Sequence, residues 1–222
     1  MCGRYTLTAP GEGIADLFEL PAIPEMAARY NIAPTQNTAV VRALASAGPR
    51  QLDMLRWGLI PYWANDLKIG SRMINARAET AATKPSFRNS LKKKRCLVVA
   101  DGYYEWKKEG AIKQPYRIIR QGGQPFAFAG LWDLWKGPDG PVESFTILTC
   151  DAAPEIRPLH HRMPVIVEQD EYNLWLDPEM KDPAELETIL QPRGGDLLED
   201  YPVDRRVGNP RNEGPECVKR IT

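Results

Sequence analysis

The sequence predicts a mixed α+β fold with a mostly antiparallel, barrel-like β core and short flanking helices. Strand-like runs outnumber helix-like runs and do not alternate regularly with them, which disfavours a doubly wound parallel sheet. The 222 residues include 17 glycines and 20 prolines, spread along the chain, so many turns are expected to join short elements. The composition shows no break, internal repeat or low-complexity block, so we expect one domain over residues 1–222.

The first expected element is a helix over Gly13–Leu20, because Ile14, Leu17 and Phe18 recur at the spacing of one helix face. Alternating patterns and β-branched or aromatic residues then predict a series of strands. These strands are expected over Thr38–Leu44, Leu52–Leu59, Arg95–Ala100, Tyr116–Arg120, Phe126–Trp132, Phe145–Cys150 and Val165–Val167. Short helices are expected near Glu79–Ala82, Glu171–Leu176 and Pro183–Leu190. The basic run Lys92–Arg95 is interpreted as a solvated loop, with contact to phosphate as the alternative.

The charge balance is neutral, with 29 basic and 29 acidic residues. This removes the basic excess from which an argument for nucleic-acid binding usually starts, although a local basic groove stays compatible with it. The basic set holds 18 arginines and 11 lysines, and arginine suits bidentate contacts with carboxylate or phosphate. Apolar stretches such as Phe126–Trp132 are far shorter than the ~20 residues that span a bilayer, so no membrane association is expected.

The cysteines and histidines give no support for a metal site. The four cysteines, at positions 2, 96, 150 and 217, form no C-x-x-C pair, and His160 and His161 are the only histidines. We therefore expect neither a metal nor a cofactor. Cys96 and Cys150 lie in apolar, strand-like runs and are expected to be buried free thiols. The N-terminus has no secretory apolar region, which favours the reduced cytoplasm.

Cys2 is the most informative residue. A small second residue permits removal of Met1, after which the chain would begin with cysteine. That terminus carries an α-amine with a pKa of about 8 and a thiol with a pKa of about 8.5, so both are partly active at neutral pH. The thiol could attack an amide with the amine as base, as in N-terminal nucleophile enzymes. Alternatively the amine could condense with an aldehyde to an imine, and the thiol could close a thiazolidine ring.

Three polar clusters offer further chemistry. Asn75 and Arg77 are two residues apart, so on an extended segment they face the same side and suit an oxygen-rich substrate. Glu105 is flanked by large aromatic residues, and desolvation there would raise its pKa toward the range of a general acid. His160, a potential proton shuttle, stands two residues before Arg162 in a loop-like segment. Each cluster also has a plain structural reading as a helix start, a strand-end charge or an inert loop.

Two segments combine aromatic residues with proline. They are Tyr30–Pro34 and Trp57–Trp63. Exposed aromatic residues beside arginine can stack on the bases of a single strand. Trp57 is expected in the core, whereas Trp63, which precedes a polar stretch, is expected to be exposed.

Taken together, these ordered motifs resemble the SRAP family of abasic-site processing proteins, almost from end to end. The chain departs from the commonest family pattern at Val99, where proline is frequent, and at His161, where aspartate is frequent. The family's H-x-R-M-P spacing selects His160. The matching segments are Met1–Tyr5, Tyr30–Pro34, Trp57–Gly58, Asn75–Thr80, Ala100–Trp106, His160–Pro164 and Val207–Pro210.

The resemblance implies an SRAP-like fold and covalent capture of abasic sites in single-stranded DNA. Cys2 would be the nucleophile, forming an imine and then a thiazolidine, and Asn75, Glu105 and His160 would complete the catalytic set. Glu105 would move protons, His160 would help to open the sugar, and Asn75 would orient Cys2. The family is also proposed to remove its own Met1, hence its peptidase label.

The resemblance further implies how the DNA is held. Arg4, Arg77 and Arg162 would contact phosphates beside the lesion, and Pro34 and Trp63 would wedge or stack next to the damaged nucleotide. The chain would act as a monomer in the DNA damage response, in the cytoplasm and at the nucleoid when engaged on DNA. Two other functions stay open on the residues alone: an N-terminal nucleophile amidohydrolase, which would release ammonia from glutamine, and a non-catalytic single-strand binder, which would form no adduct that survives denaturation.

Overall fold

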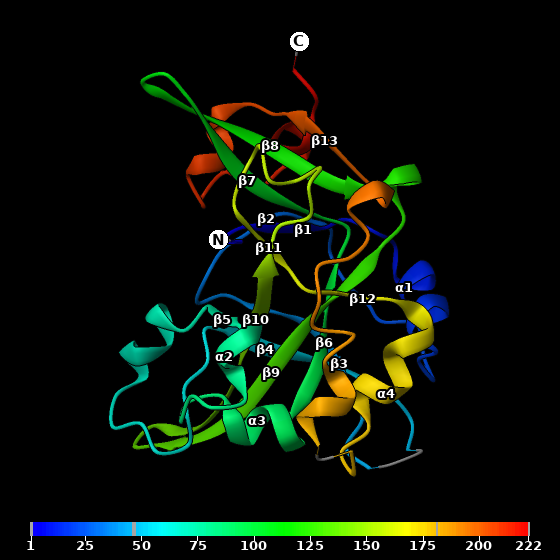
Figure 1. Ribbon diagram of the computed structural model, residues 1–222, viewed down its shortest axis with the longest axis vertical. Helices are drawn as coiled ribbons and strands as arrows, with labels where there is room; N and C mark the ends of the chain where they lie inside the picture. The colour runs from blue at the N-terminus through cyan, green and yellow to red at the C-terminus, as the bar shows by residue number, and fades with distance from the viewer. Residues whose placement is uncertain (1, 46–47, 181, 222) are drawn as a thin grey trace.

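A closed barrel of five strands forms the body of the protein (Figure 1). The computed structural model describes residues 2–45, 48–180 and 182–221. Antiparallel pairing joins β4 to β3, β3 to β6, β6 to β9 and β9 to β10, and a parallel pairing of β10 with β4 closes the ring. The barrel strands are β3 (Asn37–Arg42), β4 (Gln51–Trp57), β6 (Arg95–Ala100), β9 (Phe126–Gly137) and β10 (Gly140–Asp151). The expected mixed α+β fold with a mostly antiparallel, barrel-like core is confirmed.

Three short strands extend the barrel sheet. β5 (Asn75–Arg77) runs parallel to β10, and β11 (Arg162–Pro164) pairs with β10 in the antiparallel sense. β12 (Ile166–Val167) pairs with β9. Since β5 and β11 both lie against β10, the two motifs that contain Asn75 and Arg162 are brought to one part of the barrel.

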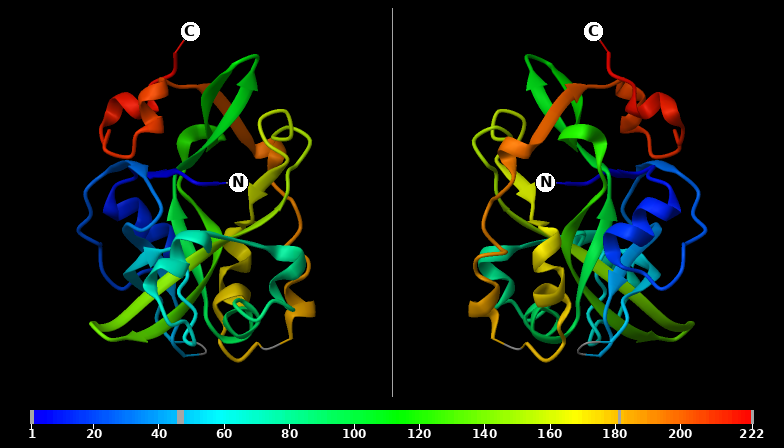
Figure 2. Two further views of the ribbon diagram at one scale, coloured as in Figure 1. Left: turned by 90° about the vertical axis from the view of Figure 1, so that its left-hand side faces the viewer. Right: turned by 90° about the vertical axis from the view of Figure 1, so that its right-hand side faces the viewer.

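A second, five-stranded sheet stands above the barrel in the view of Figure 1. Its order is β13–β8–β7–β1–β2, and every pairing is antiparallel. In Figures 1 and 2 the segment leading into β1 lies between this sheet and the barrel, beside β11. The strands are β1 (Tyr5–Leu7), β2 (Arg29–Ile32), β7 (Gly102–Glu109), β8 (Ile112–Arg120) and β13 (Leu198–Pro202).

Short helices flank the two sheets. The α-helices are α1 (Gly11–Phe18), α2 (Ala78–Ala81), α3 (Arg88–Lys93) and α4 (Tyr172–Leu176). Short 3₁₀ helices occupy Leu67–Arg72, Gln121–Gly123, Gln169–Glu171, Pro183–Leu186, Gly195–Leu197, Arg205–Gly208 and Pro215–Val218. On the predicted apolar face of α1, Ile14 and Phe18 are buried and Leu17 is half-buried. Phe18 stacks on Tyr172 of α4 with ring centroids 5.3 Å apart.

The interpretation of Lys92–Arg95 as a solvated loop was wrong in its secondary structure and at Arg95, although Lys92 and Lys93 are exposed. Lys92 and Lys93 end α3, and Arg95 is the first residue of β6. The guanidinium of Arg95 is buried and donates to the carbonyls of Leu91 (2.6 Å) and Trp175 (2.6 Å), and burial lowers its pKa to about 10. The aliphatic part of such a side chain can pack inside the protein once carbonyl groups satisfy its donors, which a charge run in the sequence does not reveal.

Candidate functional site

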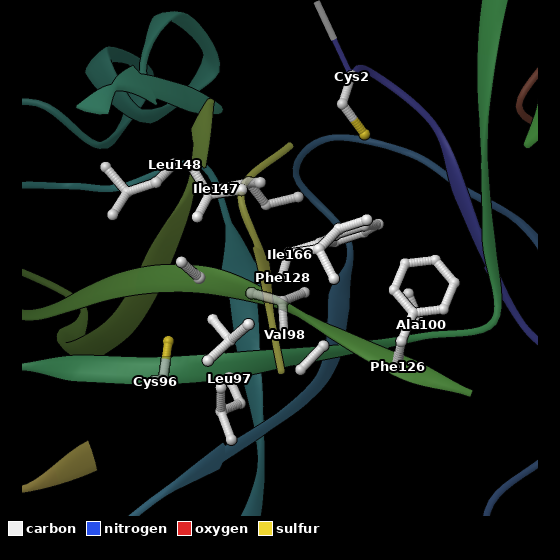
Figure 3. Packing of buried hydrophobic residues seen from close by; sticks show 14 of the residues in the cluster. Cys2, Cys96, Leu97, Val98, Ala100, Phe126, Phe128, Ile147, Leu148 and Ile166 are labelled. Atoms are coloured by element: carbon white, nitrogen blue, oxygen red, sulfur yellow. The ribbon is translucent and has the colours of Figure 1, made fainter. Parts of the chain in front are cut away.

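Cys2 lies at the junction of the two sheets. Its backbone carbonyl accepts a hydrogen bond from Asn75 Nδ2 at 2.8 Å, which ties the start of the chain to β5. Its side chain is fully buried, and Figure 3 shows the sulfur pointing toward the apolar core. The sulfur lies 4.0 Å from the carbonyl oxygen of Arg4. Burial, and next the carboxylate of Glu105, raise the pKa of the Cys2 thiol, so the thiol is protonated in this state.

Glu105 reaches the same place from β7. The β1–β7 pairing sets Tyr5 opposite Tyr103, and the Tyr104 N–H donates to the Arg4 carbonyl at 2.9 Å. Continuing this register places Glu105 opposite the residues that follow Cys2. Glu105 is 3% exposed, and burial raises its pKa to about 7. The desolvated glutamate expected from the sequence is confirmed, and it can both donate and accept a proton near neutral pH.

Asn75 and Arg77 lie on the same side of β5, as expected, because buried Ala76 separates them. While Asn75 Nδ2 holds Cys2, its Oδ1 is buried and has no hydrogen-bond partner among the described residues. Arg77 is exposed, and within the described chain it forms no ion pair or hydrogen bond. Asn75 therefore keeps one acceptor unused inside the site, and Arg77 presents a charge at its surface.

His160 is held by the backbone of Arg162. His160 Nδ1 lies 2.9 Å from the Arg162 N–H and 3.1 Å from the Arg162 carbonyl oxygen, so it accepts from the first or donates to the second according to which ring nitrogen carries the proton. Burial lowers the pKa of His160, which favours the neutral ring. The ring stacks on His161 with centroids 4.3 Å apart. The backbone of Arg162 thus fixes the position of the His160 ring through Nδ1.

The guanidinium groups of Arg4 and Arg162 are engaged inside the protein. Arg162, with a side chain 8% exposed, donates to Glu79 Oε1 and to Asp151 Oδ1, each at 2.6 Å. Arg4 donates to Asn31 Oδ1 at 2.8 Å and to the carbonyl of Val207 at 2.7 Å. Glu79 lies within the Asn75–Thr80 segment, but the sequence did not indicate its role as a partner of Arg162. The sequence did not indicate a role for Asp151 either, because its contact with Arg162 forms only in the folded chain.

Basic and aromatic side chains gather in segment 62–95, which includes Asn75 and Arg77 of the site. The segment holds nine lysines and arginines, all but Arg95 exposed or half-buried, and only two acidic residues, in a chain that is neutral overall. Within it, Trp63 is 45% and Tyr62 is 58% exposed, and a cavity of about 300 Å³ separates Tyr62 from Lys92–Lys94. Trp57 is fully buried, as expected, and Pro34 is half-buried.

The sequence gives no support for a metal site and predicts buried free thiols at Cys96 and Cys150. Across residues 2–45, 48–180 and 182–221, no group of three or more His, Cys, Asp or Glu side chains is placed to hold a metal ion. All four cysteines are free and buried, as expected for Cys96 and Cys150. In the described part of the chain, every helix is too short or too polar to cross a bilayer. The predicted removal of Met1 concerns a residue outside those that the structure describes.

Comparison with known proteins places this arrangement in context. The sequence model of a family described as SOS response associated peptidase (SRAP) matches residues 1–210. Abasic site processing protein YoqW of Bacillus subtilis is 42% identical over 224 residues, which cover 99% of each chain. Abasic site processing protein YoaM of the same organism is 41% identical, over 98% of this chain and 97% of its own. A crystal structure of a protein from Bacteroides thetaiotaomicron superposes with a TM-score of 0.88 and 28% identity, over 100% of both chains.

Proposed function

Because the chain belongs to the SRAP family, we propose that it binds abasic sites in single-stranded DNA and captures them covalently through Cys2, which shields the lesion during the DNA damage response. Relatives across its whole length are named abasic site processing proteins. The observation that carries the proposal is the convergence on Cys2 of the Asn75 hydrogen bond and of a buried glutamate with a pKa of about 7. The whole of residues 1–222 acts as one domain in this proposal.

The proposed reaction begins after Met1 is lost. The α-amine of Cys2 attacks C1′ of the ring-opened sugar, and the carbinolamine loses water to give an imine. The thiol then adds to the imine carbon, so that an S–C bond forms and the sulfur's proton ends on nitrogen. The sum is aldehyde plus aminothiol giving thiazolidine plus water, and no oxidant or reductant is needed.

Glu105 supplies the proton transfers that imine formation needs. A carboxyl with a pKa of about 7 holds comparable amounts of acid and base at neutral pH. The acid form can protonate the leaving hydroxyl of the carbinolamine, and the base form can accept a proton from the attacking amine. Burial produces this pKa, so the apolar packing around Glu105 is what allows its carboxyl group to act as both acid and base near neutral pH.

His160 and Asn75 prepare the two reactants. An abasic sugar is mostly a closed hemiacetal, and ring opening requires a proton at its ring oxygen. His160, whose ring is held against the Arg162 backbone through Nδ1, supplies that proton. Asn75 holds the Cys2 carbonyl and thereby orients the terminal amine and thiol, while its Oδ1 is available to accept from the amine.

The DNA strand is proposed to follow the basic and aromatic surface of segment 62–95. Arg77 is exposed beside Asn75 and contacts a phosphate next to the lesion, and Trp63 and Pro34 wedge or stack against the neighbouring nucleotides. Arg4 and Arg162 reach phosphates only by sharing the partners they already have, so the first effect of their guanidinium groups is to hold β1 and β11 in place. Contacts of this kind give affinity without sequence preference.

The chain is proposed to remove its own Met1, in line with the peptidase description of its family. Cys2 is fully buried in the present structure, so loss of residue 1 must also open a path to its amine and thiol. We propose that the mature protein acts as a monomer in the cytoplasm, at the nucleoid when it is engaged on DNA.

The test incubates mature protein with a uracil-excised single-stranded oligonucleotide and separates the products on a denaturing gel. The proposal expects one adduct that survives heat and detergent with wild-type protein and none with an intact oligonucleotide. Binding that disappears completely on denaturation would favour a non-catalytic single-strand binder. Release of ammonia from glutamine without any adduct would favour an amidohydrolase.

A further inference from the structure

One buried hydroxyl beside the site has no partner. Tyr103 lies on β7 two residues before Glu105, so both side chains leave the same face of the strand. The Tyr103 side chain is fully buried, and its Oη makes no hydrogen bond with any residue that the structure describes. A buried hydroxyl without a partner destabilises the folded state. The hydroxyl of Tyr103 is therefore available to a partner that forms during the reaction.

Packing does not account for the oxygen of Tyr103. The ring meets Phe128 edge-on with centroids 5.8 Å apart, and phenylalanine would make the same contact. Tyr5, directly opposite on β1, is different, because its hydroxyl donates to Thr38 Oγ1 at 2.8 Å. Tyr5 and Tyr103 thus form a matched pair in one buried cluster, one hydroxyl with a structural partner and one without.

The sulfur of Cys2 needs a donor during ring closure. Its hydrogen-bond partner among the described residues is the Arg4 carbonyl, 4.0 Å away, and an acceptor cannot stabilise a thiolate. The β1–β7 pairing sets Tyr103 opposite Tyr5, three residues after Cys2, and on the same face as Glu105, whose carboxylate acts on the Cys2 thiol. When the thiol gives up its proton to attack the imine, negative charge develops on sulfur in an apolar place, where it is poorly solvated. Burial first, and then the charge of Cys2, raise the pKa of Tyr103 well above its ordinary value. The hydroxyl therefore stays protonated and serves only as a donor.

We propose that Tyr103 is a further catalytic residue, whose hydroxyl donates a hydrogen bond to the Cys2 sulfur while the thiazolidine ring closes. The inference rests on the proposed covalent capture. In this step the S–C1′ bond forms, the π bond of the imine breaks, and the proton that leaves sulfur ends on the former imine nitrogen. Tyr103 keeps its own proton throughout and lowers the energy of the thiolate.

The test compares Tyr103→Phe with wild-type mature protein on a uracil-excised oligonucleotide. Borohydride trapping measures the imine, and the heat-stable adduct formed without borohydride measures ring closure. We expect imine formation to be unchanged and ring closure to slow about ten- to a hundredfold, as for loss of a hydrogen bond to a charged group worth about 1.5–3 kcal/mol. The defect should stay the same across neutral pH, because the Cys2 thiol is protonated in both proteins and the thiolate fraction of each rises by the same factor with pH. The midpoint of thermal unfolding should stay the same or rise.

Tyr5→Phe is the matched control. It removes a hydroxyl that has a structural partner, so it should lower the unfolding midpoint and leave the rate of ring closure unchanged. If wild-type protein forms no adduct at all, the proposed function itself fails. If wild-type and Tyr103→Phe close the ring at equal rates, or if Tyr103→Phe loses as much thermal stability as Tyr5→Phe, the role of Tyr103 is refuted while covalent capture stands.

Discussion

Replacing Glu105 by glutamine tests the electrostatics of the site through folding stability. Burial raises the pKa of Glu105 from its ordinary 4.5 to about 7. The folded state therefore binds this proton more tightly than the unfolded state. The resulting stabilisation is fully present below pH 4.5 and is lost as pH rises through 7. One pKa unit corresponds to about 1.36 kcal/mol, so the free energy of unfolding of the wild-type protein should fall by about 3 kcal/mol between pH values below 4.5 and pH values above 7. The glutamine in Glu105→Gln does not titrate, so the variant should not show this loss.

The assay is urea unfolding of both proteins at pH 5, 6, 7 and 8. The absolute stability of the glutamine variant can differ from that of the wild type, so the quantity to compare is the change with pH. Glu109→Gln is the control, because Glu109 lies on the same strand but is exposed, and its pH profile should parallel that of the wild type. Parallel profiles for wild-type protein and Glu105→Gln would refute a raised pKa at Glu105 and, with it, its role as acid and base.

Three further variants probe other parts of the account. Cys2→Ala should abolish the adduct on a denaturing gel while native gels still show reversible binding, and full-yield crosslinking by this variant would contradict ring closure through sulfur. Arg77→Ala should weaken binding to an intact single strand and lower the salt slope measured by fluorescence anisotropy by about one. Lys113→Ala, at the β7–β8 hairpin, is its control, and equal slopes would remove Arg77 from the phosphate contacts. Arg162→Ala should cost about 2 kcal/mol in urea unfolding, because it removes bonds to Glu79 and to the buried Thr149 carbonyl, and an unchanged stability would contradict the positioning role given to Arg162.

The fold could be predicted where local sequence and tertiary structure agree. Arg95–Ala100 is apolar and β-branched, and it is a strand with the predicted bounds. Strands β1, β2 and β13 were not predicted, because each is short and is stabilised by pairing with distant parts of the chain. Strand β7 was not predicted either, because the second half of Gly102–Glu109 is polar. This half forms a strand because it pairs with β8. The pattern of residues within a short segment does not indicate which distant segment it pairs with.

The site was predictable in residue type and less so in environment. The flanking aromatic residues correctly indicated a desolvated Glu105, and the exposure of Trp63 also followed from its polar neighbours. Arg162 was expected at a phosphate, yet it binds Glu79, which is 83 residues away in the chain, so only the fold reveals the pair. The unpartnered hydroxyl of Tyr103 is likewise invisible in the sequence, since it depends on what surrounds the ring.

Intact-mass spectrometry of the protein, with and without a uracil-excised oligonucleotide, tests the central claim most directly. The account predicts a free protein lighter by one methionine residue, and a reacted protein heavier by the oligonucleotide minus one water. A protein that keeps Met1, or one that loses Met1 and still gains no mass from the abasic oligonucleotide, would contradict capture through the terminal aminothiol of Cys2.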